Sequence, residues 1–276
     1  MPAPQASLLA QQTKTLFAAK QKELQEGYEE PTEQFDDAFA ITEQIAVPNA
    51  PTNLLREVSL NKYHVDAAKD ISDKLEAYID GVSKGICGGI DNWMKMTMIT
   101  TVIINGPVGM LTPGGVVGPP LGPLILAGSP MATPMEMKYT NAIANAFGAA
   151  WQSWSAGLMG QLMYPAFAAF PGPMAPPTPN IPVPLVTLSS PGESMLSPST
   201  LAKQMEGNLG DPEAAHAEIL FECLAKAFGT VFQTFKASTM VTGVMGFGPI
   251  PTFVPPFVPV GPVVAGAVIP KPGVLV

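Results

Sequence analysis

The chain has 276 residues and a formal net charge of −8, and it combines 47% hydrophobic residues with 31 prolines and 26 glycines. The hydrophobic content excludes a disordered chain, which needs low hydrophobicity and high charge. The acidic balance and a single arginine, Arg56, exclude a nucleic-acid-binding protein, because phosphate recognition needs clustered Lys and Arg. A chain rich in both apolar residues and proline is expected to bury extended segments on helices or on neighbouring subunits.

The charged residues are concentrated in the first third of the chain. Three long stretches, 96–135, 139–192 and 237–270, contain no charged residue. Surfaces of this kind are expected to be buried in the domain, in an oligomer or in a membrane. Prolines interrupt these stretches before they reach about 20 proline-free apolar residues, so no transmembrane span is expected. The N-terminal residues lack a basic region followed by a long apolar run, so no signal peptide is expected.

The N-terminal part, residues 1–58, is predicted to be a charged helical region. Leucine and phenylalanine recur at helical spacing over 7–27, with Ser7 as a candidate N-cap. A second helix is predicted over 31–46, and the proline- and asparagine-rich segment 48–53 is typical of a turn or linker.

A segment of eight residues occurs three times, at 86–93, 147–154 and 228–235. Large side chains match in the three copies, and a methionine follows each copy five residues later. Internal repetition at offsets of 61 and 81 residues indicates an architecture assembled from copies of one unit. The matched positions, which we expect to pack in equivalent layers of the core, are Ile86, Ile90, Trp93, Met98, Phe147, Trp151, Trp154, Met159, Phe228, Phe232, Phe235 and Met240.

Each copy is predicted to lie on a helix that is followed by a proline-rich arm. The second helix has a capping-box pattern at Thr133, Pro134 and Glu136, and the third is expected to begin at Asp211 and Pro212.

Proline disfavours central strands, so the arms are expected to cross helices of this chain or of another copy. The sequence therefore predicts a mainly α fold with little regular β structure, in which three helix-plus-arm units, 59–130, 131–198 and 199–276, follow the N-terminal helical region.

Several glycines lie inside the predicted repeat helices, among them Gly85, Gly89 and Gly148. Each costs about 1 kcal/mol of helix stability relative to alanine, which is tolerable where another backbone approaches closely. Two arrangements fit: a crowded core made by the three units, or a tight helix bundle around an axis.

No catalytic, cofactor or metal site is predicted. His216 and Cys223 share a helix face, but two ligands do not make a zinc site, and the other histidine, His64, has no partner pattern. Cys87 and Cys223 fit buried thiols in helices, and the carboxylates of the N-terminal third fit a solvated face. The chain is therefore not expected to be an enzyme.

The arms carry a second repeated pattern. Gly106-Pro107 is followed by Gly118-Pro119-Pro120-Leu121-Gly122-Pro123-Leu124-Ile125, with an echo at 248–264. In this pattern and in composition, residues 80–276 resemble small structural proteins of contractile-tail bacteriophages and related contractile injection systems.

The resemblance implies a tail or baseplate component of a virion or injection particle, assembled in the bacterial cytoplasm. Its arms would pack on other subunits, identical or different, and it would have no catalytic residues. The alternative is a membrane-active protein, such as a pore former, a piercing element or a delivered effector, which contacts lipid without a transmembrane span.

Overall fold

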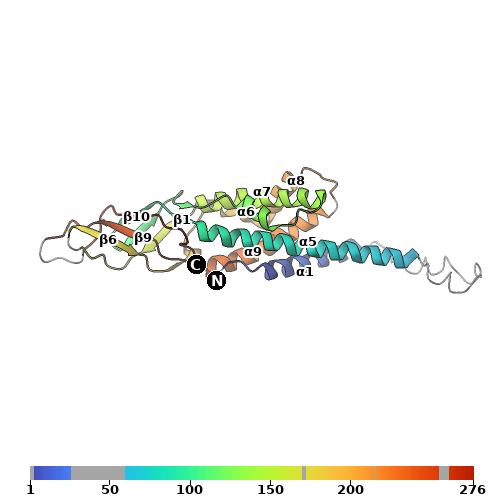
Figure 1. Ribbon diagram of the computed structural model, residues 1–276, viewed down its shortest axis with the longest axis horizontal. Coiled ribbons are helices and arrows are strands. Elements are labelled where there is room, and N and C mark those ends of the chain that lie inside the picture. The colour runs from blue at the N-terminus through green and yellow to red at the C-terminus, as the bar shows by residue number, and fades with distance from the viewer. Residues whose placement is uncertain (1–2, 26–59, 170–171, 215, 255–260) are drawn as a thin grey trace, which may run out of the picture.

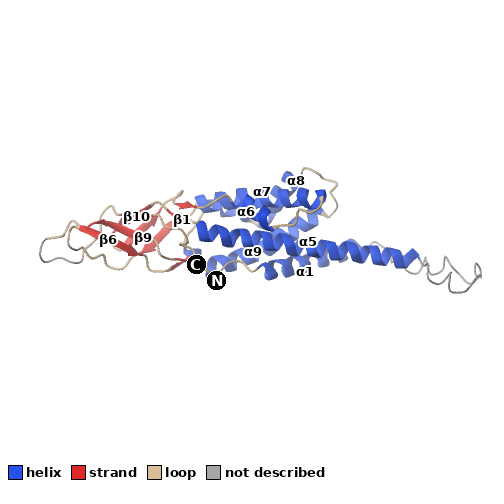
Figure 2. Cartoon of the chain, viewed as in Figure 1, coloured by secondary structure: helices blue, strands red, loops and turns tan. Residues whose placement is uncertain are grey.

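The computed structural model describes residues 3–25, 60–169, 172–214, 216–254 and 261–276. The molecule is elongated, with its helices at one end and its strands at the other (Figures 1 and 2). The α-helices are α1 (Ala6–Gln25), α5 (Leu60–Met96), α6 (Leu121–Gly128), α7 (Pro134–Ala156), α8 (Pro198–Leu209) and α9 (Ala217–Ser238).

Six helices form a closed ring at the helical end. The long helices α5, α7 and α9 carry the three copies of the repeat, and a shorter helix packs between each pair of them. Helix α6 lies between α5 and α7, α8 lies between α7 and α9, and α1 lies between α9 and α5. The ring therefore has approximate threefold symmetry about the long axis of the molecule. Of the two arrangements that fit the glycines in the sequence, this is the helix bundle around an axis.

Local sequence signals predict some helix boundaries and miss others. The candidate N-cap Ser7 is wrong, because α1 begins at Ala6 and Ser7 lies inside it. The capping box at the start of α7 is confirmed, because Thr133 and Glu136 each accept a backbone N–H of the other. The third repeat helix begins at Ala217 and not at Asp211, so this expectation is wrong. The Asp211 side chain instead accepts the N–H of Glu213 and shapes a turn, and His216 then has a positive φ of 60°. The helix predicted over 31–46 lies outside the described residues.

Glycines let the short helix α6 approach two long helices at backbone distance. A Cβ on Gly85 of α5 would lie 2.9 Å from the carbonyl oxygen of Ile125, and one on Gly148 of α7 would lie 3.0 Å from the nitrogen of Gly122. A Cβ at Gly85 would therefore clash, and one at Gly148 would force its neighbour to shift, so the intrinsic helix cost of these glycines is offset by close packing.

The other end of the molecule corrects the expectation of little regular β structure. Within the described residues the proline-rich arms form ten short strands in four small antiparallel sheets, so the fold is mixed α and β. The strands are β1 (Met98–Ile99), β2 (Val102–Asn105), β3 (Val108–Leu111), β4 (Val116–Val117), β5 (Gly160–Met163), β6 (Met174–Pro179), β7 (Val183–Pro184), β8 (Met240–Val241), β9 (Met245–Pro249) and β10 (Ala267–Ile269).

The arms pair with one another in a cycle. Each arm leaves the bundle through an outgoing strand (β2, β5 or β9) and comes back through a returning strand (β3, β6 or β10). Returning strand β3 pairs with β5, and returning strand β6 pairs with β9. The third arm closes the cycle, because Ile104 of β2 and Gly266 exchange two backbone hydrogen bonds of 2.9 Å.

Prolines occupy positions in these strands that need no N–H donor. In β6 the register against β9 shifts between Ala175 and Thr178, and Pro176 and Pro177 fall in that irregularity. Proline is excluded from regular central strands, but it is tolerated in short strands with bulges. The expectation of little β structure was wrong because it considered only regular central strands.

Two glycines of α5 that lie three residues apart, Gly85 and Gly88, test the close approach of α6. We expect Gly85→Ala to destabilise the protein by about 1–3 kcal/mol, because the new methyl group overpacks the contact with Ile125. Gly88 is exposed, and a Cβ there meets no atom within 4 Å. Gly88→Ala should therefore stabilise the protein by about 0.5–1 kcal/mol through helix propensity. Urea unfolding of both variants measures the difference, and equal effects would contradict the packing argument.

Candidate functional site

The repeat residues on the helices lie on the axis of the bundle. All nine are at most 2% exposed. Phe147 and Phe228 meet edge to face with ring centroids 4.8 Å apart, and Trp93 meets Trp151 in the same way at 5.1 Å. Trp154 contacts both Trp93 and Trp151, and Phe232 contacts Trp151 and Trp154. These rings join the three long helices to one another and are buried, so they make a packed core.

The three repeat methionines lie where the helices pass into the strands. Met98, Met159 and Met240 are each partly buried, and each pairs with a residue of its own returning arm. Met98 pairs with Val117, Met159 exchanges hydrogen bonds with Ser189, and Met240 does so with Val276. These three pairings form a collar around the junction of the two ends.

The collar repeats its pattern of burial in the three units. Val117, Ser189 and Val276 are exposed, whereas the residues just before them are buried. These preceding residues are Val116, Leu188 and Leu275. We call the exposed residues Val117, Ser189 and Val276 the collar positions.

Backbone hydrogen bonds between units also recur at the collar. Gly273 donates to the carbonyl of Thr97 at 3.0 Å, and Leu185 donates to that of Thr239 at 2.8 Å. Gly114 of the first unit donates to the carbonyl of Ala156, at the end of α7, at 2.7 Å. Each unit is thus bonded to the next by its returning arm.

Tyr164 fills the interior of the strand end. Its ring lies between the backbones of two strands, where a Cβ on Gly109 would come within 2.8 Å of it and one on Gly246 within 2.6 Å. Its hydroxyl is buried without a hydrogen-bond partner, and burial raises the pKa of this group above its ordinary range. The tyrosine is therefore a packing residue and does not act as an acid or base near neutral pH.

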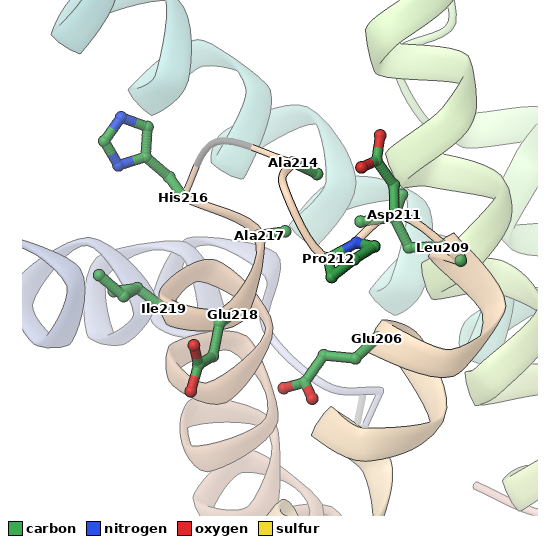
Figure 3. A pocket seen from close by; sticks show the side chains of 10 residues that line it. Glu206, Leu209, Asp211, Pro212, Ala214, His216, Ala217, Glu218 and Ile219 are labelled. Atoms are coloured by element: carbon green, nitrogen blue, oxygen red, sulfur yellow. The ribbon is translucent and has the colours of Figure 1, made fainter.

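A cavity of about 510 Å³ lies where α8 passes into α9, and it carries several titratable side chains. Figure 3 shows that the ring of His216 turns away from the side to which Glu206 and Glu218 extend. All three side chains are exposed, so the cavity does not enclose them in buried, apolar surroundings. Among the described residues, no group of three His, Cys, Asp or Glu side chains could hold a metal ion.

A second cavity, of about 370 Å³, is largely apolar and lies at the end of the bundle far from the strands. Tyr78, Tyr139 and Leu220 line it from the three long helices, and Ile71 and Met135 stand at its edge. Helix α5 continues past this point to the far end of the molecule (Figure 1). The cavity offers shape for an apolar group but no converging set of catalytic side chains.

The two cysteines are packing residues in this fold. Both are buried, and burial raises the pKa of the Cys87 thiol to about 12. A thiol of this kind is a poor nucleophile and a poor metal ligand at neutral pH. The side chain of His64, the other candidate in the sequence, lies outside the described residues.

The surface of the strand end is apolar and almost free of charge. Over the described residues of 98–117, 158–189 and 239–276, the only charged side chain is Lys271. Hydrophobic side chains that are more than 40% exposed occur on most of its strands, and they include Ile103, Met110, Val117, Met163, Met174, Ile181, Val264, Ile269 and Val276. The repeat pattern in the sequence did not identify this surface, although the uncharged stretches contain all of these residues except Val276.

None of the helices in the described part of the chain is long and apolar enough to span a membrane. No protein-family model, curated protein or solved structure matches the chain. A proposal for the function therefore rests on the geometry of the helices, arms and cavities.

The buried hydroxyls of two tyrosines give a matched test of the core. Tyr164→Phe removes an unpaired buried group, so we expect stability to be unchanged or to rise by up to about 1–3 kcal/mol. The hydroxyl of Tyr78 forms a 3.1 Å hydrogen bond with Thr140, so Tyr78→Phe should cost about 0.5–1.5 kcal/mol. Denaturant midpoints of the two variants report these changes, and a large loss for Tyr164→Phe would mean that its hydroxyl has a partner.

The ion pairs that hold α1 in the ring predict a dependence on pH. Hydrogen bonds from Lys20, and to a smaller extent from Lys226, keep the pKa of Glu222 below its ordinary value of 4.5. A lowered folded-state pKa stabilises the protein above the unfolded pKa, and this contribution is lost as the pH falls through the folded value. We expect wild type to be more stable than Glu222→Gln at pH 6, and this difference to shrink as the pH falls below 4.5.

Thermal melts over a pH series measure the Glu222 effect. Glu206→Gln is the control, because Glu206 is an exposed residue of α8 away from α1. This variant should follow the wild-type pH profile. A difference between wild type and Glu222→Gln that stays constant down to low pH would contradict the assignment.

Proposed function

We propose that the protein is a structural component of a large particle, namely the tail of a phage or a contractile injection system. The observation that carries this proposal is the closed threefold pairing, in which each arm bonds to the next unit and the third arm bonds to the first. This pairing joins the described parts of the three repeat units into one rod with a packed axis. Such a design suits a part that bears load or sets symmetry in an assembly.

The cavities support a structural role over a catalytic one. An active site needs converging polar groups with perturbed pKa values in a concave pocket. The cavity near His216 has exposed carboxylates, and the cavity at Tyr78 is lined mainly by apolar groups. The arms, which were expected to pack on other subunits, find their first partners within the chain, so contacts to other subunits fall on the outer surface of the rod.

One observation favours membrane activity as a second candidate. The strand end exposes apolar side chains without charge, and such a surface also partitions into lipid. Anionic headgroups would favour clustered Lys or Arg nearby, and Lys271 is the only basic side chain among the described residues of that end.

A single fractionation tests both candidates. The full chain, with a tag at its N-terminus, is expressed in the cells that produce the particle, and the lysate is separated by velocity sedimentation and by flotation in a density gradient. We expect the 28.9-kDa chain to sediment with particles visible by electron microscopy. Recovery only at the top of the sedimentation gradient would contradict the proposal. Flotation with vesicles, reversed by detergent, would contradict it in favour of membrane activity.

A further inference from the structure

We infer that the strand end is enclosed by a protein with threefold rotational symmetry, with one copy of this chain on the symmetry axis. The inference rests on the proposed function and specifies the partner. It concerns the surface around the collar positions Val117, Ser189 and Val276, which belong to the three different repeat units.

The collar presents the same local structure three times. Each collar position is exposed, lies opposite a repeat methionine, and follows a buried residue of the same arm. Each returning arm also bonds through its backbone to the end of a long helix of the next unit, at Thr97, Thr239 or Ala156. Because the collar surface occurs three times around the axis, it offers three equivalent contacts to a partner with threefold symmetry about the same axis.

The chemistry of the surface limits the class of partner. The strand end carries Lys271 as its only charged side chain among the described residues, so it matches an uncharged protein surface and not phosphate groups of nucleic acid or of anionic lipid. The cores of protein interfaces are likewise depleted of charge and rich in apolar side chains. Exposed Ile103 and Met110, which lie opposite each other on β2 and β3, extend this surface away from the collar.

Threefold symmetry of the partner makes use of all three contacts at once. After one contact forms, the next two are intramolecular, so weak individual contacts add to a tight complex. An asymmetric partner would use one contact and leave the other apolar faces exposed to water. This reasoning favours a symmetric protein socket over a single docked chain.

Site-specific photo-crosslinking tests the inference. A photoreactive phenylalanine analogue replaces Val117, Ser189 or Val276, one at a time, in the full chain within the particle fraction. We expect each position to crosslink to the same polypeptide and, by mass spectrometry of the peptides, to the same short segment of it. A matched control set lies on the bundle at equivalent exposed positions of the three long helices, namely Lys84, Asn145 and Lys226.

The outcomes separate the inference from the proposed function. If the chain sediments with particles but the collar positions react with different segments, or only one reacts, the threefold partner is overturned while the particle role stands. Equal crosslinking of the bundle set to the same segment also overturns it, because the partner would not be specific to the strand end. Crosslinking to lipid, together with flotation, overturns both.

A charge substitution gives an independent measurement. Val117→Lys and Ser189→Lys place an ammonium group at two collar positions that are already exposed, so neither change buries a charge in the free protein. Both should reduce recovery in the particle fraction to a similar extent, whereas Asn145→Lys should not. A loss confined to one of the two collar variants would point to an asymmetric partner and contradict the inference.

Discussion

The contact of three long helices through large side chains on their common axis is the constraint on which the rest of the structure depends. Short helices lie between the long ones, so the backbones of the long helices stand too far apart for small side chains to meet. Phe147 with Phe228 and Trp93 with Trp151 bridge that distance at ring separations of 4.8 and 5.1 Å. The spacing of the long helices thus matches the size of the aromatic side chains. Large side chains recur in the three copies of the repeat because they span this distance.

The strand end extends the same symmetry by a different interaction. There the backbone joins the units, through pairings such as that of Ile104 with Gly266. The returning arm of each unit pairs with the outgoing strand of the next unit, so both three-stranded sheets contain strands from two units. The three repeats are therefore interdependent parts of one domain at the strand end, although each long helix has its own recognisable sequence.

The sequence revealed those features that depend on neighbouring residues or on repetition. The layers from Ile86 to Phe235, the capping box at Thr133 and the need for close approach at Gly85 could all be predicted. The strands could not be predicted, because many of their partners lie in other units and because prolines interrupt the alternation of apolar and polar residues that is typical of a strand. The start of α9 was missed because a turn at Asp211 competes with the helix cap that the same residues could form. The collar needed the strand pairing before its equivalent positions could be identified.

Helix α1 closes the ring, and this has a consequence for the order of folding. It packs between α5 and α9, and its Lys20 pairs with Glu222, a residue 202 positions further along the chain. During synthesis the first helix is made long before the last, so its apolar residues Leu9 and Phe17 have only part of their final partners until α9 emerges. Loops this long slow closure and leave apolar surface exposed on the way. The newly made chain is consequently most prone to aggregation just before its last long helix is complete.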